Sequence, residues 1–318
     1  MVNVEADVLA GPLLAQQAET AGVVYSLAWG DQPALICEHV DWARSCGFEV
    51  TAAGKGTRYL PEYHSLTPDT VWNVLREYLD IDDPNSINLQ MFNSFLDGSK
   101  SAIEMTAVCN ATGLVPQASG LTFPPSSRFS LADVCKPEQD GGALTRSGTT
   151  EVVSSLERSG EPIDHHLAMG TFVIVKPGTD YARQCFREYH MLPDESGLYG
   201  ALYRPTHMIG LELGLSVASV ALRGEPTGQP YCFSSDVVAV AKRDLKAGEM
   251  LDGEGGHCVY GQQMPASLSI AKDALPLGLS GGVTLSRDVS AGQVLCEADT
   301  ALDNSDDAVK ARRMMISG

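Results

Sequence analysis

The chain has little positive charge. It carries 22 Lys and Arg residues against 40 Asp and Glu residues, so its formal net charge is -18 at pH 7. Nucleic acids and anionic membrane surfaces repel an acidic protein, and we therefore expect neither as a partner. A small anionic substrate remains compatible with this charge, because a local group of Arg and Lys can be positive on a negative surface.

Paired cysteines, a basic leader and long apolar runs are also absent from the sequence. The eight cysteines are scattered and form no C-x-x-C pair, which argues against a zinc ribbon, a dithiol redox motif or a disulfide framework. The first residues include Glu5 and Asp7 where a secretory signal needs basic side chains. No apolar run approaches the roughly 20 residues that cross a bilayer. These absences predict reduced thiols and a cytoplasmic location.

Several catalytic signatures are missing as well. No G-x-S-x-G elbow of a serine hydrolase occurs. Asp164, His165 and His166 stand alone as candidate metal ligands, and three consecutive side chains cannot all reach one ion without strain, so we predict no metal. The turn G-x-G-x-x-G, which lets a backbone approach the pyrophosphate of a dinucleotide, does not occur either.

The sequence does contain an alternation of strands and helices in its first part. The predicted strands are 1–4, 23–27 and 48–52, and the predicted helices are 11–21 and 31–46. Such alternation is typical of a parallel, doubly wound sheet. Residues 1–58 are therefore predicted to be the second half of a Rossmann-like nucleotide domain.

Residues 59–230 mix strands and helices without this alternation. We predict an α+β catalytic domain there, with an antiparallel sheet that carries helices on one face. Thr171 to Val175 is a predicted strand. Thr206 to Leu222 is a predicted helix, and because its residues are small and apolar we expect it to be buried.

A composition break at Gly224 to Pro230 precedes a duplicated motif. The segments that begin at Arg243 and Arg287 share the pattern R-D-aliphatic-x-A-G-x-aliphatic-L. Each copy is typical of a strand, a tight turn and a second strand. Residues 231–318 are therefore predicted to form a small β module with internal pseudo-symmetry. The predicted fold class of the whole chain is α/β.

Three charged side chains are candidate catalytic groups. Lys55 stands between two glycines after a predicted strand, where its ammonium could polarise a carbonyl or bind phosphate across a cleft; the alternative is a solvated turn lysine. Lys100 and Glu104 are four residues apart on a predicted helix. They would form an ordinary ion pair if exposed, and an acid–base pair if buried in their apolar surroundings.

Further polar residues extend the predicted substrate site. Asp97 and Asn110 lie before and after the predicted acid–base pair. Arg204, Thr206 and His207 stand where a strand is predicted to meet a helix. Free N–H groups at a helix start beside an arginine suit a phosphate or carboxylate, and His207 is a candidate for proton exchange; the alternative is a structural cap.

Several segments together resemble a known enzyme family. They are Met1 to Asp7, Ser26 to Pro33, Ala53 to Gly56, Phe95 to Lys100, Asn110 to Leu114 and Tyr203 to His207. In these segments the sequence is similar to homoserine-dehydrogenase-like, NAD(P)-dependent oxidoreductases with a C-terminal SAF domain. Among them are the 1-deoxy-D-xylulose 5-phosphate reductoisomerase-like enzymes. The duplicated turn resembles the β-clip SAF module.

The resemblance implies an NAD(P) cofactor and residues that approach it. It places Gly30, Asp31 and Pro33 in a strand–helix turn near the nicotinamide. It places Asn3 and Glu5 in a turn where homoserine-converting members have a lysine. A carboxylate in place of that lysine argues against homoserine as the substrate.

The resemblance also implies a glycine-rich unit in the family template before the position of Met1. Without such a unit we expect weak binding of NAD(P)H. The predicted function is that of an oxidoreductase or reductoisomerase acting on a small oxygenated substrate, with or without a phosphate. A non-catalytic ligand-binding or assembly protein and a SAF-type carbohydrate-binding or chaperone module stay open as alternatives, and so does a homo-oligomer.

Overall fold

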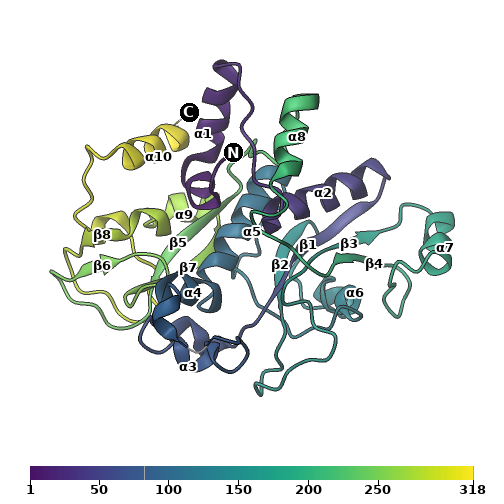
Figure 1. Cartoon of the computed structure of the whole chain (residues 1–318), viewed down its shortest axis with the longest axis horizontal. Helices are drawn as coiled ribbons and strands as arrows, with labels where there is room; N and C mark the ends of the chain where they lie inside the picture. Colours follow the sequence, from purple (N-terminus) through teal and green to yellow (C-terminus); the bar gives the residue numbers. More distant parts are fainter. Residues whose placement is uncertain (82, 318) are drawn as a thin grey trace.

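The structure is a computed structural model that describes residues 1–81 and 83–317. Figure 1 shows a mixed sheet at one end of the molecule and short antiparallel ribbons at the other, with helix α5 (Ser99–Thr112) between them. The architecture is α/β, which confirms the predicted fold class.

The main sheet has four strands in the order β2-β1-β3-β4. Their bounds are β1 Glu49–Thr57, β2 Thr149–Ser154, β3 Thr171–Lys176 and β4 Gly200–Arg204. β1 runs parallel to β2 and antiparallel to β3, which is antiparallel to β4. The strand predicted at 48–52 is therefore a central strand of a mixed sheet, whose other strands come from the middle of the chain.

Two glycines allow neighbouring backbone to approach β1 closely. A Cβ on Gly54 would lie 1.7 Å from the carbonyl oxygen of Glu151 in β2. A Cβ on Gly56 would lie 2.0 Å from the carbonyl oxygen of Leu167. The glycines beside Lys55 are thus required by packing within and next to the sheet.

Helices cover one face of the sheet, and a short helix with irregular chain covers the other. α2 (Gln32–Ser45) and α5 pack on the first face, where Ile36 and Val40 meet Val173 in one buried core. α6 (Leu131–Val134) and its neighbours pack on the second face. The sheet therefore has two covered faces, rather than helices on one face alone.

The predicted strand at 1–4 is wrong. Helix α1 (Val4–Thr20) begins there, and the side chain of Asn3 caps it by accepting a hydrogen bond of 2.9 Å from the N–H of Ala6. An asparagine cap followed by acidic residues in the first turn is a helix-start signal, and it outweighs the strand preference of two valines.

The predicted strand at 23–27 is wrong as well. This segment is extended but pairs with no sheet, and its backbone bonds to irregular chain instead. The N–H of Val2 donates to the carbonyl of Ser26 at 3.1 Å, and the N–H of Leu27 donates to that of Gly228 at 2.8 Å. The β-branched residues Val23 and Val24 thus lie in the irregular connection between α1 and α2.

The prediction of a buried helix over 206–222 is only partly right. Helix α8 spans Gly214–Arg223, and the residues before it form turns. Its apolar side chains face outward, with Leu215 54% and Leu222 84% exposed. Small and apolar composition indicated burial, but in the part of the chain that the structure describes nothing covers this face.

The β module contains two small antiparallel sheets. β5 (Ser235–Ala241) pairs with β7 (Val259–Pro265), and β6 (Met250–Asp252) pairs with β8 (Gly281–Thr284). The remaining α-helices are α3 (Trp72–Leu75), α4 (Leu89–Leu96), α7 (Asp180–Glu188), α9 (Ala266–Ala271) and α10 (Asp307–Ser317). Five short 3-10 helices complete the described elements: Pro61–Ser65, Pro84–Ser86, Glu138–Asp140, Leu277–Leu279 and Glu297–Asp299.

The two copies of the duplicated motif contact each other reciprocally. Leu245 and Val289 exchange backbone hydrogen bonds of 2.8 and 3.0 Å. Asp288 accepts a hydrogen bond from the N–H of Ala247 in the first copy, at 3.0 Å. Its counterpart in the first copy, Asp244, accepts one from the N–H of Ala291 in the second copy, at 2.9 Å. This reciprocity confirms the predicted pseudo-symmetry.

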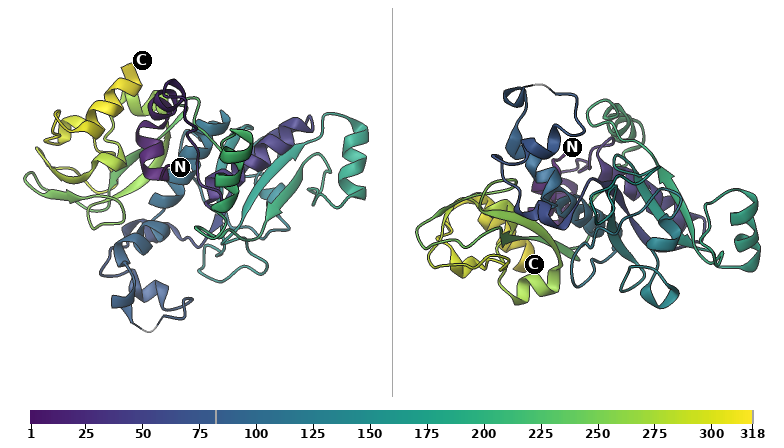
Figure 2. Two further views of the ribbon diagram at one scale, coloured as in Figure 1. Left: turned by 45° about the horizontal axis from the view of Figure 1, so that its top comes forward. Right: turned by 90° about the horizontal axis from the view of Figure 1, so that it is seen from below.

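The β module shares its main core with two helices from the first part of the chain. Val8 of α1 and Ile103 of α5 are buried in one cluster with Val237, Val259 and Leu295 of the module. Figure 2 shows α1 lying against the module, while the segment that holds α3 and α4 projects from the body. None of the described helices is long and apolar enough to span a membrane.

Candidate active site

The centre of the candidate site is an ion pair between Lys55 and Glu104. Lys55 lies near the end of β1 and Glu104 lies in the middle of α5, where the lysine Nζ donates to the carboxylate. Their side chains are only 8% and 5% exposed. Lys55 is therefore not a solvated turn lysine but a buried charge with a buried partner.

A second pair lies closer to solvent. Lys100, one turn before Glu104 on α5, pairs with Glu5 of α1, and these side chains are 14% and 32% exposed. The i,i+4 pair expected between Lys100 and Glu104 does not form. Each of the two residues binds a different element instead, which joins α5 to both α1 and β1.

Asp31 connects the two pairs electrostatically. The pKa of Asp31 is raised to about 6, because burial and the charge of Glu104, which raise it, outweigh Lys100 and Lys55, which lower it. Burial also lowers the pKa of Lys100, but the charges of Glu104 and Glu5 outweigh it, so that this pKa is raised. Asp31 and Lys100 thus each lie within electrostatic reach of three of the other four residues. We call the five residues the lysine–carboxylate cluster: Glu5, Asp31, Lys55, Lys100 and Glu104.

Two further predicted site residues, Asp97 and Asn110, lie at the ends of α5 and are engaged elsewhere. Asp97 accepts a hydrogen bond of 2.9 Å from the N–H of Ser99 and pairs with Lys242 at 2.8 Å. Asn110 accepts hydrogen bonds from the N–H groups of Ser234 and Ser235, at 2.9 and 3.0 Å. Both side chains are fully buried and tie α5 to the β module.

The residues of the predicted anion site lie close together, but their polar atoms already contact other protein groups. Arg204 pairs with Glu212, and its Nε donates to the carbonyl of Thr206 at 3.0 Å. Nδ1 of His207 lies 2.8 Å from the carbonyl oxygen of Met169. α8 begins only at Gly214, so these residues do not form the start of a helix. An anionic group would have to compete with the carboxylate of Glu212 for Arg204.

Four of the predicted cofactor residues have structural tasks at helix starts. Asn3 caps α1, while Asp31 caps α2 by accepting a hydrogen bond of 2.9 Å from the next N–H. Pro33 is buried in the first turn of α2. Gly30 has φ of 95°, and a Cβ there would lie 2.7 Å from the carbonyl oxygen of Met208, so only glycine lets these chains meet. Glu5, the fifth, pairs with Lys100 in the cluster.

Comparison with known protein families identifies the part of the chain that holds this site. Residues 30–213, more than half of the chain, match the family described as Oxidoreductase DRL, catalytic domain. The chain belongs to this family. Residues 236–300 match the SAF domain, which confirms the module predicted from the duplicated turn. A search of curated proteins found no significant match.

The chain is therefore an enzyme of the oxidoreductase class in which a SAF domain follows a DRL catalytic domain. The matched catalytic segment includes Asp31, Lys55, Lys100 and Glu104, whereas Glu5 lies outside it on α1. The cluster thus combines a helix outside the family match with β1, α2 and α5 inside it.

His39 is a further buried polar residue next to the site of this DRL oxidoreductase. Its Nε2 lies 3.0 Å from the hydroxyl oxygen of Thr171, which is the residue in register with Lys55 across the sheet. Burial and, to a smaller extent, the charge of Arg204 lower the pKa of His39 to about 4, so the ring is neutral at pH 7. A lone histidine on the apolar face of α2 gave no functional signal in the sequence.

A hollow lies on the opposite side of α5 from the cluster. It is lined in part by Ala102, His64, Phe123 and Tyr260. Ala102 is two residues from both Lys100 and Glu104, which places it on the other face of the helix. None of the lining residues is a lysine or a carboxylate, so the hollow offers a substrate no charged group of the kind that the cluster provides.

Within residues 1–81 and 83–317, no group of three or more His, Cys, Asp or Glu side chains has the arrangement of a metal site.

Proposed function

We propose that the lysine–carboxylate cluster is the substrate side of the active site in an NAD(P)-dependent oxidoreductase or reductoisomerase. The substrate is a small oxygenated molecule that reacts at a carbonyl or hydroxyl group. One observation carries this proposal. Lys55, Lys100 and Glu104 belong to two lysine–carboxylate pairs, one buried and one near solvent, and their charges act on the pKa of Asp31. All four residues lie in the segment that matches the oxidoreductase catalytic domain.

Lys55 and Glu104 are suited to stabilise charge on the reacting oxygen. A carbonyl oxygen becomes negative as it is reduced, and a fixed ammonium stabilises that charge more in the transition state than in the ground state. An ammonium has three donors, and Glu104 accepts from one of them, so Lys55 retains donors for a substrate oxygen. The low exposure of the pair strengthens such an interaction, because little water screens it.

Asp31 is suited to exchange the proton that accompanies this reaction. Its pKa of about 6, raised by burial and by Glu104, lies close to neutral pH, where a carboxyl both accepts and releases a proton readily. It is partly exposed at the start of α2, so it can also exchange that proton with solvent. We therefore assign Asp31 the role of general acid and base.

Lys100 is the group that would bind an anionic or hydroxyl part of the substrate. Its side chain is more exposed than that of Lys55, and its partner Glu5 is the most exposed member of the two pairs. Displacement of Glu5 by a substrate carboxylate, phosphate or hydroxyl would keep the ammonium paired. Arg204 offers a second such position if Glu212 is displaced from it.

The dinucleotide does not fit the residues predicted to hold it. A pyrophosphate at the start of α2 would meet the carboxylate of Asp31, and the side chain of Asn3 is already used as a cap. The sequence also lacks the glycine-rich turn through which a backbone approaches pyrophosphate. NAD(P), when bound, would supply or accept the hydride.

The test is hydride transfer with millimolar NADH or NADPH, so that weak binding of the dinucleotide does not hide turnover. The panel contains small aldoses, ketoses and hydroxy acids, each with and without a phosphate. We expect oxidation of one cofactor with one substrate class, and Lys100→Met should raise KM by about 10-fold to 100-fold through loss of a charged hydrogen bond.

Two other results would count against the proposal. Binding of panel members without turnover would favour a ligand-binding or assembly protein, and binding confined to carbohydrates at the SAF domain would favour the carbohydrate-binding alternative. A cytoplasmic location and assembly into a homo-oligomer stay predictions, and gel filtration with light scattering tests the second.

A further inference from the structure

Helix α8 turns its polar side toward the rest of the chain. Its buried residues are Ser216 and Ser219. The hydroxyl of Ser216 accepts a hydrogen bond of 2.8 Å from the N–H of Trp29, and that of Ser219 donates one of 2.9 Å to the carbonyl of Glu225. An ordinary amphipathic helix packs its apolar side on the core and exposes its polar side. α8 has the opposite arrangement, so its apolar side faces outward.

The outward side of α8 carries a regular apolar stripe. Leu215, Ala218 and Leu222 are exposed and lie on one side of the helix, and Leu211 precedes them in the turn that leads into α8. The four residues are separated by four, three and four positions, which is the spacing at which two helices pack side by side along a seam. We call them the α8 stripe: Leu211, Leu215, Ala218 and Leu222.

The exposed apolar area is large for a surface that meets only water. Leu211 and Leu222 are 83% and 84% exposed, and Ile209 and Val217 beside the stripe are 62% and 52% exposed. Together with Leu215 these side chains present roughly 500 Å2, on the order of the largest apolar patch on a typical monomer, and such patches are often interaction sites. Figure 1 shows α8 projecting at the edge of the molecule, beside α2.

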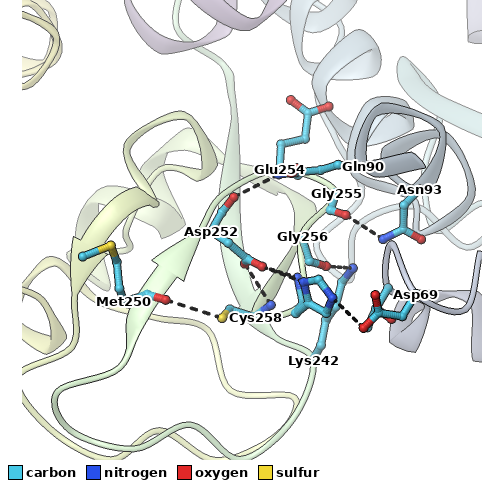
Figure 3. Close-up of polar contacts among 12 residues, drawn as sticks. Asp69, Gln90, Asn93, Lys242, Met250, Asp252, Glu254, Gly255, Gly256 and Cys258 are labelled. Carbon is cyan, nitrogen blue, oxygen red and sulfur yellow. Dashed lines mark hydrogen bonds and ion pairs between the residues drawn. The ribbon is translucent and has the colours of Figure 1, made fainter. Parts of the chain in front are cut away.

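The other projecting segment, which holds α3 and α4, is anchored within the chain. Figure 3 shows the SAF loop at 252–258 beside α4. Nε2 of Gln90 donates to the carbonyl of Glu254 at 2.9 Å, and Nδ2 of Asn93 donates to that of Gly255 at 2.8 Å. The outward side of α8 has no such neighbour among the described residues, and its groups are apolar. Another apolar surface is therefore what suits it.

Charge distinguishes the stripe from the rest of the molecule. The chain has a formal net charge of -18, so two copies repel each other over most of their surfaces. Residues 208–222 contain a single charged side chain, that of Glu212, and it pairs with Arg204. At the end of α8, Arg223 pairs with Glu225 at 3.3 Å. The surface around the stripe is thus locally neutral, and two copies can approach there with little repulsion.

The stripe is also complementary to itself. A two-fold axis near Ala218 would set two α8 helices antiparallel, because the same patch then meets itself. Leu215 of each copy would face Leu222 of the other, on either side of the axis. The small side chains of Ala218 and Ala221 would let the two backbones approach closely between these leucine pairs.

We propose that the α8 stripe is the contact surface of a homodimer, in which two α8 helices pack antiparallel across a two-fold axis near Ala218. Burial of the stripe and its apolar neighbours in both copies removes roughly 1,000 Å2 from water, and a polar rim brings the total into the range of about 1,200–2,000 Å2 that stable interfaces bury. The dimer does not depend on the proposed function, and it assigns a surface to the predicted homo-oligomer.

The first test is the mass of the protein in solution, measured by light scattering and sedimentation from about 1 to about 100 μM. We expect a dimer for the wild type. Leu215→Glu/Leu222→Glu buries four carboxylates in the interface and should raise the dissociation constant by about 100-fold or more. Met250→Glu is the matched control, because Met250 is 65% exposed in the SAF domain and Figure 3 shows its side chain pointing away from the loop at 252–258.

The control should leave the mass unchanged, and circular dichroism should show every variant folded, since the substituted side chains are exposed. A wild type that stays monomeric up to about 100 μM would overturn the proposal and leave the stripe to a different partner. A dimer that the stripe variant does not weaken would overturn it as well, because the copies then meet elsewhere.

The second test decides the direction of the two helices. Leu215→Glu/Leu222→Lys sets opposite charges against each other only if the helices are antiparallel, whereas a parallel pair would set like charges together. We therefore expect this variant to dimerise at least 10-fold more tightly than Leu215→Glu/Leu222→Glu, with the difference reduced at high salt. Equal dissociation of the two variants would overturn the antiparallel arrangement.

Discussion

At the scale of the residue, the buried Lys55–Glu104 pair makes a prediction about stability. Lys55→Met keeps most of the side-chain stem but leaves Glu104 buried without its partner, which should cost about 3–5 kcal/mol of unfolding free energy. The double variant Lys55→Met/Glu104→Gln removes both charges and should recover most of that loss. Urea unfolding of both variants measures this, and a single variant as stable as the wild type would show that the pair is not buried in solution.

Asp7 predicts how stability depends on pH. It is fully buried on α1, where Tyr25 donates a hydrogen bond of 2.8 Å to it. Burial raises its pKa to about 7, although the Tyr25 hydrogen bond lowers it. Because this pKa exceeds the unfolded value of about 3.9, the folded state holds the proton longer, and its stability falls as pH rises from about 4 through 7.

The variant Asp7→Asn removes this titration. Compared with the wild type, it should gain about 2–3 kcal/mol more at pH 8 than at pH 5. Asp164→Asn changes an exposed aspartate and serves as the control. Urea unfolding at the two pH values measures the difference, and an equal effect of Asp7→Asn at both would contradict a buried, titrating Asp7.

The sequence identified the charged residues of the cluster more readily than their partners. Lys55 stands out because two glycines flank it after a predicted strand, and Lys100 and Glu104 stand out because they lie in an apolar stretch. The i,i+4 spacing predicted that Lys100 would bind Glu104, yet the nearest opposite charges come from β1 and α1. Tertiary packing decided these partnerships, and spacing along one helix carries no information about it.

At the scale of the element, the pairing of β1 with β2 requires a glycine at position 54. Gly54→Ala would place a Cβ 1.7 Å from the carbonyl oxygen of Glu151, which must force β1 and β2 apart. We expect this variant to lose its cooperative thermal transition. Gly178→Ala is the matched control, since a Cβ there meets only the carbonyl oxygen of Gly47 at 3.6 Å, an ordinary contact. Circular dichroism on heating compares them, and a normally folded Gly54→Ala would show that the strands are not so close.

Elements whose apolar residues follow a regular spacing, or whose first residues carry a helix-start signal, were predicted correctly. α2 has both an aspartate cap and a proline in its first turn, and the strand at 171–175 is β3. The errors at 1–4 and 23–27 came from short β-branched segments, whose conformation is set by what the neighbouring chain offers for hydrogen bonding. α8 was predicted as buried from composition alone, and composition does not say which surface is available to cover a helix.

At the scale of the whole molecule, the catalytic and SAF parts should unfold together. Ile103 of α5 is 2% exposed within the core that the SAF strands share. Ile103→Ala should therefore destabilise the whole chain by about 2–4 kcal/mol and leave one unfolding transition. Hydrogen exchange of β1 and β5 amides reports on the two parts separately. Faster exchange in only one part would show that the shared core does not couple them.

The central claim is that the Lys55–Glu104 pair performs chemistry in addition to holding β1 against α5. The measurement that tests it most directly is kcat of the double variant Lys55→Met/Glu104→Gln, at saturating cofactor and substrate. This variant retains the shape of the site and most of its stability, so a loss of rate reports on the charges. We expect kcat to fall by about 100-fold or more, because the charge that develops on the substrate oxygen loses its ammonium. A double variant that is folded and turns over at the wild-type rate would contradict the account.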